Sequence, residues 1–274
     1  TVLLPLGTST VTCSATDAAG NVETGSFTVA INYTPPADPG APYWITDLDV
    51  PNSNDCFYIG TWDQQSKTCT LTSDFSSTSS GIIIGSSERE PNNVLGMTID
   101  GAGYTITGPG SSASGDDYGV DTRNRDHFTI KNLNIQGFDI GIRTNNASDG
   151  TITGNTLTSN NDDGIYSESD TRLKITNNII TQNGRNGITL NGGTGDPGSS
   201  SGFVVKQNSL ESNANFGIEA FNTSGIWFEQ NTAFDNLKGF YLSNNSDNSF
   251  VGNTANSNTN NGFAFFGSTN FVFT

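Results

Sequence analysis

The stretch Gly141-Ile142-Arg143-Thr144-Asn145 has a counterpart 23 residues later, Gly164-Ile165-Tyr166-Ser167-Glu168. In both stretches apolar or small residues alternate with larger polar ones, which is the period of a β-strand and not of a helix. The glycine–apolar pair recurs at Gly119-Val120, Gly141-Ile142, Gly164-Ile165, Gly187-Ile188, Gly217-Ile218, Gly239-Phe240 and Gly262-Phe263. Subtracting the glycine numbers gives steps of 22, 23, 23, 30, 22 and 23. A fixed period of this size predicts a solenoid, whose repeats bury their apolar sides by stacking on each other.

The length of the repeat predicts what one coil contains. Three short strands and three turns use up roughly 22 residues. We therefore predict an all-β chain that winds once in 22–23 residues, with each strand pairing in parallel with a strand of the next coil. A leucine-rich horseshoe is excluded because its leucine consensus and its helical segment are both missing. An antiparallel sandwich or barrel would not keep seven markers in one register.

Stacked coils place equivalent residues in columns. Three interior columns are predicted: Val120, Ile142, Ile165, Ile188, Ile218, Phe240 and Phe263; Thr122, Thr144, Ser167, Leu190, Ala220, Leu242 and Phe265; and Ile152, Ile175, Val205, Phe228 and Phe250. Two asparagine columns follow the same period: Asn155, Asn178, Asn208, Asn231 and Asn253, and five residues later Asn160, Asn183, Asn213, Asn236 and Asn258. We expect these asparagines at turns, because Asn tolerates left-handed backbone angles and its amide can bond to the amide one coil away.

This repeat resembles the right-handed parallel β-helix repeat of the pectate-lyase-like superfamily. The stretch Ile99-Asp100-Gly101-Ala102-Gly103 and the residues up to Gly108 look like the opening coil of such proteins. The resemblance covers about residues 82–274 and implies a right-handed β-helix. It leaves the activity open, because members include lyases, hydrolases, epimerases, adhesins and phage tailspikes.

The chain is predicted to have four segments. Residues 1–34 alternate around a turn and form a β-hairpin, 35–42 are a proline-rich linker, 43–81 are an N-terminal cap, and 82–274 are the β-helix. The first segment is similar to the C-terminal half of a hyalin-repeat (immunoglobulin-like) module. That resemblance makes Cys13 one half of a disulfide whose partner would lie in the missing half.

Two cysteines in the predicted cap lie across a turn that contains glycine. Cys56 and Cys69 are predicted to form a disulfide, and a pair of metal ligands is the alternative. Lysine and arginine number 11 against 27 acidic residues, giving a net charge of −16, which argues against nucleic acid and anionic lipid as partners. We find no stretch apolar enough for a membrane span and no signal peptide at the start, and we expect an extracellular or cell-surface location.

The residues two after each marker glycine should point outward on one flat face. The carbohydrate-binding residues predicted from this column are Asp121, Arg143, Tyr166, Glu219 and Tyr241, to which we add Trp227. Aromatic rings can cover the C–H faces of sugars, and charged groups can hold hydroxyls or uronates. An ordinary solvated face is the alternative for the column. For Trp227, the alternative is burial under the insertion at 191–202.

Two further groups of residues could carry chemistry. One acidic residue lies two positions before each of three marker glycines: Asp117, Asp139 and Asp162. Their stacked charges suggest a Ca²⁺ site, and loop residues that splay apart are the alternative. The catalytic candidates are His127, Lys174, Arg143 and Asp163. His127 is the one histidine and could act as a general acid or base. Lys174, beside Arg172 and Asp170, is similar to the base of β-helix lyases.

The pair Asp162-Asp163 resembles the acids of galacturonan hydrolases, although the Gly-His-Gly element of that family is missing. We therefore predict an extracellular structural or adhesive β-solenoid that faces carbohydrate, as part of a larger surface protein or filament. The alternative is a polysaccharide lyase, epimerase or glycoside hydrolase that works on the outward face. The hairpin 1–31 and the phenylalanine-rich C-terminal coil are predicted to self-associate.

Overall fold

The computed structural model describes residues 7–31, 37–46, 54–85, 96–110, 116–122, 124–192 and 201–274. The chain divides into two compact units, Thr1–Pro39 and Gly40–Thr274. The described residues form 29 strands and one short helix, α1 (Cys56–Ile59), which confirms the all-β class. Of the predicted linker 35–42, residues 37–42 are described and form neither strand nor helix.

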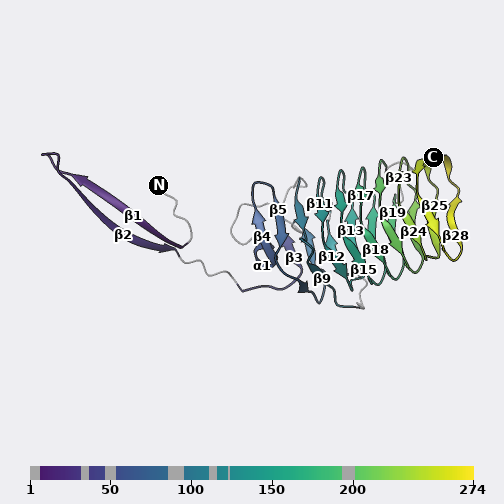
Figure 1. Ribbon diagram of the computed structural model, residues 1–274, viewed down its shortest axis with the longest axis horizontal. Coiled ribbons are helices and arrows are strands. Elements are labelled where there is room, and N and C mark those ends of the chain that lie inside the picture. Colours follow the sequence, from purple (N-terminus) through teal and green to yellow (C-terminus); the bar gives the residue numbers. More distant parts are fainter. Residues whose placement is uncertain are drawn as a thin grey trace. The chain divides into compact units, whose positions relative to one another are not determined.

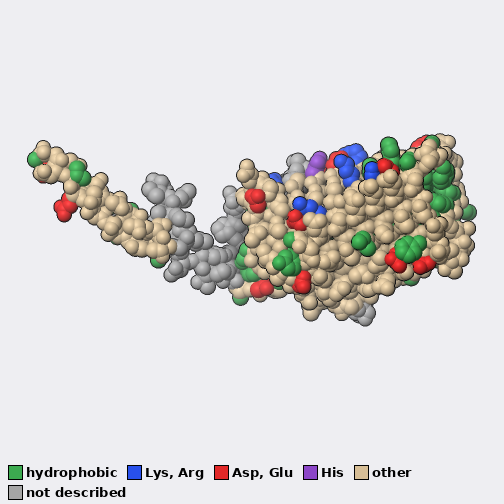
Figure 2. All heavy atoms as spheres, viewed as in Figure 1, with side chains coloured by type: hydrophobic (Ala, Val, Ile, Leu, Met, Phe, Trp, Pro, Cys, Tyr) green, Lys and Arg blue, Asp and Glu red, His purple; other side chains and the backbone are tan. Residues whose placement is uncertain are grey.

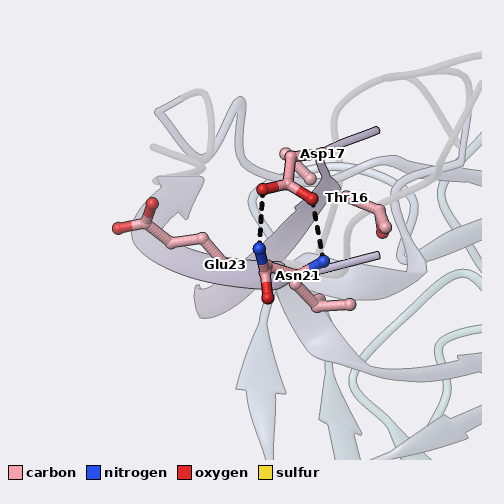
Figure 3. A pocket seen from close by; sticks show the side chains of 6 residues that line it. Thr16, Asp17, Asn21 and Glu23 are labelled. Atoms are coloured by element: carbon pink, nitrogen blue, oxygen red, sulfur yellow. Dashed lines mark hydrogen bonds between the residues drawn. The ribbon is translucent and has the colours of Figure 1, made fainter. Parts of the chain in front are cut away.

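The first unit is the predicted β-hairpin. Strands β1 (Gly7–Thr16) and β2 (Val22–Ile31) pair antiparallel along their whole length. The Asp17 carboxylate closes the turn by accepting the backbone N–H and the side-chain amide of Asn21, both at 2.9 Å (Figure 3). These bonds, led by the one from the Asn21 side chain, lower the pKa of Asp17. The hollow drawn in Figure 3 therefore lies beside a turn whose polar groups bond to each other.

The second unit consists of three sheets (Figure 1). Sheet 1 contains β3 (Tyr43–Ile45), β7 (Ile82–Ile84), β10 (Tyr118–Asp121), β13 (Ile140–Asn145), β16 (Ile165–Glu168), β19 (Ile188–Asn191), β22 (Phe216–Phe221), β25 (Lys238–Ser243) and β28 (Asn261–Phe266). Sheet 2 contains β4 (Gly60–Asp63), β5 (Thr68–Leu71), β8 (Thr98–Asp100), β11 (Thr129–Lys131), β14 (Thr151–Thr153), β17 (Lys174–Thr176), β20 (Val204–Lys206), β23 (Trp227–Glu229), β26 (Ser246–Val251) and β29 (Thr269–Phe273). Sheet 3 contains β6 (Phe75–Ser76), β9 (Thr105–Thr107), β12 (Asn134–Gln136), β15 (Thr156–Thr158), β18 (Ile179–Thr181), β21 (Ser209–Glu211), β24 (Thr232–Phe234) and β27 (Thr254–Asn256).

From β7 to β27 each coil gives one strand to every sheet. From β7 onward the neighbours of a strand in its sheet are the strands of the coils before and after it, and they pair in parallel. Ile142 pairs with Ile165, and Ile165 with Ile188, so the glycine–apolar marker sets the register. The predicted parallel coil is therefore confirmed, and the coils succeed one another along the body in Figure 1.

The three predicted interior columns form the core. Their members are buried from the second marker coil to the sixth, and only the last coil leaves Phe263 and Phe265 partly exposed. The marker glycine is required by the close approach of successive coils. A Cβ on Gly141 would lie 2.6 Å from the carbonyl oxygen of Gly164 in the next coil, so any side chain there would collide with backbone.

The two asparagine columns form hydrogen-bonded ladders through the interior. Asn155 donates both its backbone N–H and its side-chain amide to Oδ1 of Asn178, and the same pair of bonds repeats in the following coils and in the second column. One expectation was wrong. The ladder asparagines do not adopt the left-handed conformation; the residue before each of them does, such as Gly154 and Asn177. Asparagine is therefore needed for its amide and not for its backbone freedom.

The segment 43–81, predicted as a cap, also forms a coil of the solenoid. β3, β5 and β6 pair in parallel with β7, β8 and β9, so the winding already begins at Tyr43. β4 then folds back antiparallel on β5 and covers that edge. Cys56 and Cys69 form the predicted disulfide, with their Cα atoms 5.7 Å apart, and join α1 to β5. This coil lacks the glycine marker, which is why the repeat pattern did not reveal it.

Candidate functional site

The outward column of sheet 1 has the predicted register. Asp121, Arg143, Tyr166, Thr189, Glu219 and Tyr241 pair from coil to coil along β10, β13, β16, β19, β22 and β25. The expectation that all of them face solvent was wrong for Asp121 and Thr189, which are both fully buried. Oδ1 of Asp121 lies 3.7 Å from Nη1 of Arg143, whose longer side chain extends to the surface. Asp121 therefore supports Arg143 and is not itself open to a ligand.

Arg143 also contacts an aromatic ring of the preceding coil. Its guanidinium carbon lies 5.0 Å from the ring centroid of Tyr118, within the range of a cation–π interaction. The Tyr118 hydroxyl donates a hydrogen bond to Asp116, and burial raises the pKa of that hydroxyl to about 12. Tyr118 therefore stays neutral and fixes one side of Arg143.

Arg185 is the centre of the face and was missed among the predicted binding residues. Its guanidinium lies 3.4 Å from a Glu219 oxygen, 3.6 Å from Asp163 and 3.7 Å from Asp162. The side chain is still 40% exposed, so the group is held in place and remains accessible. The sequence did carry a signal, because Arg185 replaces aspartate in the column of Asp117, Asp139 and Asp162.

Asp163, a catalytic candidate, lies beneath Arg185. Its side chain is fully buried and accepts the backbone N–H of Asn186 at 3.0 Å. Burial, followed by the charge of Asp162, raises the pKa of Asp163 to about 7, against the opposing effect of Arg185. A buried carboxyl does not reach a polymer that lies on the surface, so in this structure Asp163 positions Arg185.

The neighbouring polar groups are ordered by each other. Asn186 donates its side-chain amide to Thr189 at 2.9 Å and to Glu219 at 2.7 Å, while its oxygen accepts the backbone N–H of Phe216. The hydroxyl of Tyr166 accepts a hydrogen bond from Asn191, and burial raises its pKa. The middle of the face is therefore pre-organised before any ligand arrives.

Aromatic rings and a lysine continue the face toward the C-terminus. The rings of Phe216 and Tyr241 lie with centroids 4.9 Å apart, and Nζ of Lys238 lies 4.3 Å from the Tyr241 centroid and 5.2 Å from that of Phe216. Neither Lys238 nor Phe216 was predicted as a site residue. Each directly precedes a marker glycine, and the residue type at that position varies from coil to coil.

The predicted calcium ligands follow one another along the same edge. Asp139 accepts the backbone N–H of Asp117 at 3.1 Å, and Asp162 lies beside Arg185. In the part of the chain that the structure describes, no group of three or more His, Cys, Asp or Glu is placed to hold a metal ion. Binding of Ca²⁺ here stays a prediction, without a ready set of ligands to support it.

The other catalytic candidates do not join this face. Lys174 begins β17 in sheet 2, and His127 precedes β11 in the same sheet, whereas Arg143 and Asp163 belong to sheet 1 and the turn before it. The expected grouping of Lys174 with Asp170 was wrong, because Asp170 is buried. Its carboxylate accepts hydrogen bonds from Thr144, Ser167 and the backbone N–H of Ala147.

Trp227 lies on sheet 2 as well. It is 51% exposed, between the buried Ile226 and Phe228, as the alternation predicted. Residues 193–200 of the insertion proposed to cover it lie outside the described residues. The structure therefore shows two separate outward surfaces, one on sheet 1 and one on sheet 2.

These features allow the family to be assigned. The family described as "Right handed beta helix region" matches residues 62–197 and 191–274, which is most of the chain. The chain belongs to this right-handed β-helix family. A search of curated proteins finds no significant match. In the described residues, no helix has the length and apolar character needed to cross a membrane.

Solved structures similar to this β-helix protein include enzymes and phage proteins. A mutant of the periplasmic alginate epimerase AlgG has a TM-score of 0.51 and 18% identity, over 77% of this chain and 58% of that one. The Dettilon tailspike protein has a TM-score of 0.45 and 18% identity, over 74% and 48%. The A-module of an Azotobacter vinelandii mannuronan C-5 epimerase has a TM-score of 0.41 and 13% identity, over 75% and 61%. The chain spans less than two thirds of the length of each, and the likeness to the AlgG mutant, whose TM-score exceeds 0.5, supports the fold alone.

Proposed function

We propose that this β-helix is an extracellular structural module that binds polysaccharide along the outward face of sheet 1. One observation carries the proposal: Arg185 is exposed yet held by three carboxylates, with Tyr166 one coil before it and Phe216, Lys238 and Tyr241 in the coils after it. Coils repeat at a strand spacing of about 4.8 Å. A polymer lying along the axis can thus meet a new ring or charge at each coil.

The chemistry of the row suits sugars. Partly exposed aromatic rings offer apolar faces to sugar C–H groups, and guanidinium and ammonium groups donate hydrogen bonds to hydroxyls or carboxylates. Because Arg185 is already fixed by its carboxylates, little side-chain entropy is lost when a ligand binds. Lys238 has no carboxylate partner among the described residues, so its charge can be used by an acidic sugar.

Two further observations support the setting. The disulfide between Cys56 and Cys69 fits an oxidising compartment, as expected outside the cytosol. Alginate, after which the epimerase AlgG is named, is the polysaccharide to test first.

A polysaccharide lyase, epimerase or hydrolase is the second proposal, favoured by the pKa of about 7 at Asp163. A group that titrates near neutral pH is suited to general acid–base catalysis. Burial of Asp163 beneath Arg185 and the location of His127 and Lys174 on another sheet favour the binding module instead.

The test is binding to immobilised alginate, polygalacturonate and a neutral glucan. We expect Arg185→Ala and Tyr241→Ala to weaken binding at least tenfold, because they remove the central charge and a ring. Tyr104→Ala is the matched control, since Tyr104 is exposed and precedes β9 in sheet 3. Equal binding by all three variants would contradict the proposal. New unsaturated uronate absorbance, reducing ends or C5 epimerisation during incubation would replace it with the enzyme.

A further inference from the structure

The turn between sheets 1 and 2 carries a row of charged residues that the sheet 1 face does not use. His127, Asp149 and Arg172 occupy equivalent positions in three successive coils, and each has a positive φ between 54° and 57°. The backbone N–H of His127 bonds to Ser148 in the next coil, as that of Asp149 does to Thr171. The three side chains therefore project from one edge of the solenoid, one above the other.

The cationic groups of Arg172 and Lys174, together with His127, lie near the carboxylate of Asp149 in this row. Arg172 donates Nε to Asp149 at 2.8 Å and Nη2 at 2.6 Å, and Nε2 of His127 lies 3.7 Å from the same carboxylate. The hydrogen bonds of Arg172, together with the charges of Arg172, His127 and Lys174, lower the pKa of Asp149. Figure 2 shows Lys and Arg side chains gathered near the histidine along one edge. Asp126 adds a second acid nearby, which also acts on Arg172.

Several donors in this cluster remain unused. The hydrogen bonds of Arg172 engage Nε and Nη2, which leaves Nη1 available, and its side chain is 58% exposed. Lys174 is exposed, and its ammonium group makes no hydrogen bond or ion pair in the described part of the chain. In a chain of net charge −16, such a concentration of free cationic donors is unusual.

The two coils after Arg172 present exposed backbone in place of a side chain. The position of Arg172 is taken there by Gly202 and Gly225, whose φ angles are 72° and 61°. A Cβ on Gly202 would lie 3.2 Å from Cγ of Arg172, so the arginine stem passes directly over this glycine. The exposed backbone of Gly202 and Gly225 thus forms a strip without side chains that begins at Arg172, and we call this strip the glycine floor.

An exposed aromatic ring lies at the far end of this floor. Lys174, Val204 and Trp227 succeed one another in the outward column of sheet 2. Two strand spacings therefore separate Lys174 from Trp227, about 10 Å along the axis. Trp227 is followed in the column by Ser249, too short to cover it, and is 51% exposed.

We propose that this surface is a second saccharide site, in which His127, Arg172 and Lys174 hold a carboxylate or sulfate group and Trp227 covers a sugar ring of the same chain. The arginine is fixed by Asp149 before binding, so its remaining donors point to a defined place. A tryptophan ring provides the large apolar face that a sugar ring needs, while the cations select an acidic sugar over a neutral one. The site lies on a different sheet from the proposed polysaccharide face, so either can fail without the other.

The test compares oligogalacturonate, a sulfated galactan oligosaccharide and its desulfated form, each titrated into the intact chain by calorimetry. We expect Lys174→Gln to weaken binding of the two acidic ligands at least fivefold and to leave the neutral one unchanged. Trp227→Ala should weaken all three, and added salt should weaken only the acidic ones. Preference between oligogalacturonate and the sulfated galactan distinguishes a carboxylate ligand from a sulfate ligand.

Two variants keep the outcome unambiguous. Lys206→Gln is the matched control, because Lys206 lies on the same sheet but is already paired with Glu229 at 3.0 Å, and this variant should bind like the wild type. Arg185→Ala removes the central charge of the sheet 1 face. It should leave intact the weaker binding at the proposed second site on sheet 2. Unchanged binding by both Lys174→Gln and Trp227→Ala, or loss of all binding in Arg185→Ala, would overturn the second site.

Discussion

Asn178 donates its backbone N–H and its side-chain amide to Oδ1 of Asn208, each over 3.0 Å, although the two residues are 30 positions apart. In the neighbouring coils the same pair of bonds spans 22 or 23 positions, as between Asn208 and Asn231. The seven additional residues of this coil therefore do not change the register of the ladder. The ladder, and not the length of the chain, fixes where the next strand lies.

Removal of one ladder amide should destabilise the protein. In Asn178→Ala the backbone N–H and the side-chain amide of Asn155 lose the buried oxygen that they share, and the carbonyl of Ile152 loses one donor. Each unsatisfied group costs about 1–3 kcal/mol, so we expect a loss of at least about 2 kcal/mol in the free energy of unfolding. Urea unfolding followed by circular dichroism measures it. Ser209→Ala, whose hydroxyl makes no hydrogen bond among the described residues, should change stability little; an equal loss there would contradict the role of the ladder.

The stability should fall as the pH rises from about 4 to about 7. Asp163 has its pKa raised from 3.8 to about 7 in the folded protein, so between these values the folded state binds more protons than the unfolded state. The contribution of Asp163 to the free energy of unfolding is complete below pH 4 and is lost as the pH approaches 7. The span corresponds to about 4 kcal/mol at most. Asp170, with its pKa raised to about 6, acts in the same direction.

The variant Asp163→Asn isolates this effect. It removes the charge while its amide oxygen can still accept the N–H of Asn186, so unfolding free energies at pH 5 and pH 8 should differ less than in the wild type. Asp235→Asn is the matched control, because Asp235 is exposed and is not among the groups that shift the pKa of Asp163. If both variants kept the full pH dependence, Asp163 would not be its source.

The disulfide should stabilise the first coil. Its cysteines are 13 residues apart, and closing a loop of this size contributes about 3 kcal/mol by the chain-entropy estimate. We expect a double Cys56→Ala and Cys69→Ala variant to melt at a lower temperature, measured by calorimetry. Cys13→Ala should leave the melting temperature unchanged, because Cys13 is free and exposed on the hairpin. A melting temperature unaffected by the double substitution would show that β4 and α1 hold the coil without the bond.

Self-association through the C-terminal coil is the fourth prediction. Phe266 is 68% exposed there, next to exposed Val272 and Phe273, on strands β28 and β29 that pair on only one side. Sedimentation velocity of this chain should show larger species with increasing concentration. Phe266→Asp should suppress them, whereas Ile179→Asp, an exposed apolar residue of sheet 3, should not. A strictly monomeric chain at high concentration would contradict the prediction.

The register of the solenoid could be predicted from the sequence because it depends on local rules. Alternation tells which side chains point inward, and the glycine at each marker is forced by contact with the next coil, as at Gly141. The pairing of Ile142 with Ile165 follows directly from these two constraints. The first coil was not predicted from the repeat because Tyr43 and Cys69 stand at positions where the next coil has Ile82 and Ile99.

The candidate site was predicted less completely. Alternation gives the direction of a side chain, but it does not tell whether a longer neighbour covers it, as Arg143 covers Asp121. Nor does it give the reach of a long side chain, so the three carboxylates around Arg185 were not foreseen. The separation of Lys174 from Asp163 could have been read from the columns, because Lys174 directly precedes the interior Ile175 of another sheet.

Among the described residues, each strand after β5 pairs only with strands of the coil before it and the coil after it. No strand pairing in that part of the chain joins the two ends of the stack, so the fold sets no fixed number of coils. Duplicating one coil would lengthen it by a single strand spacing, about 4.8 Å, and would demand no change in the coils already present. A gene encoding such a chain can therefore gain or lose whole coils, and the number of coils sets the length of the solenoid.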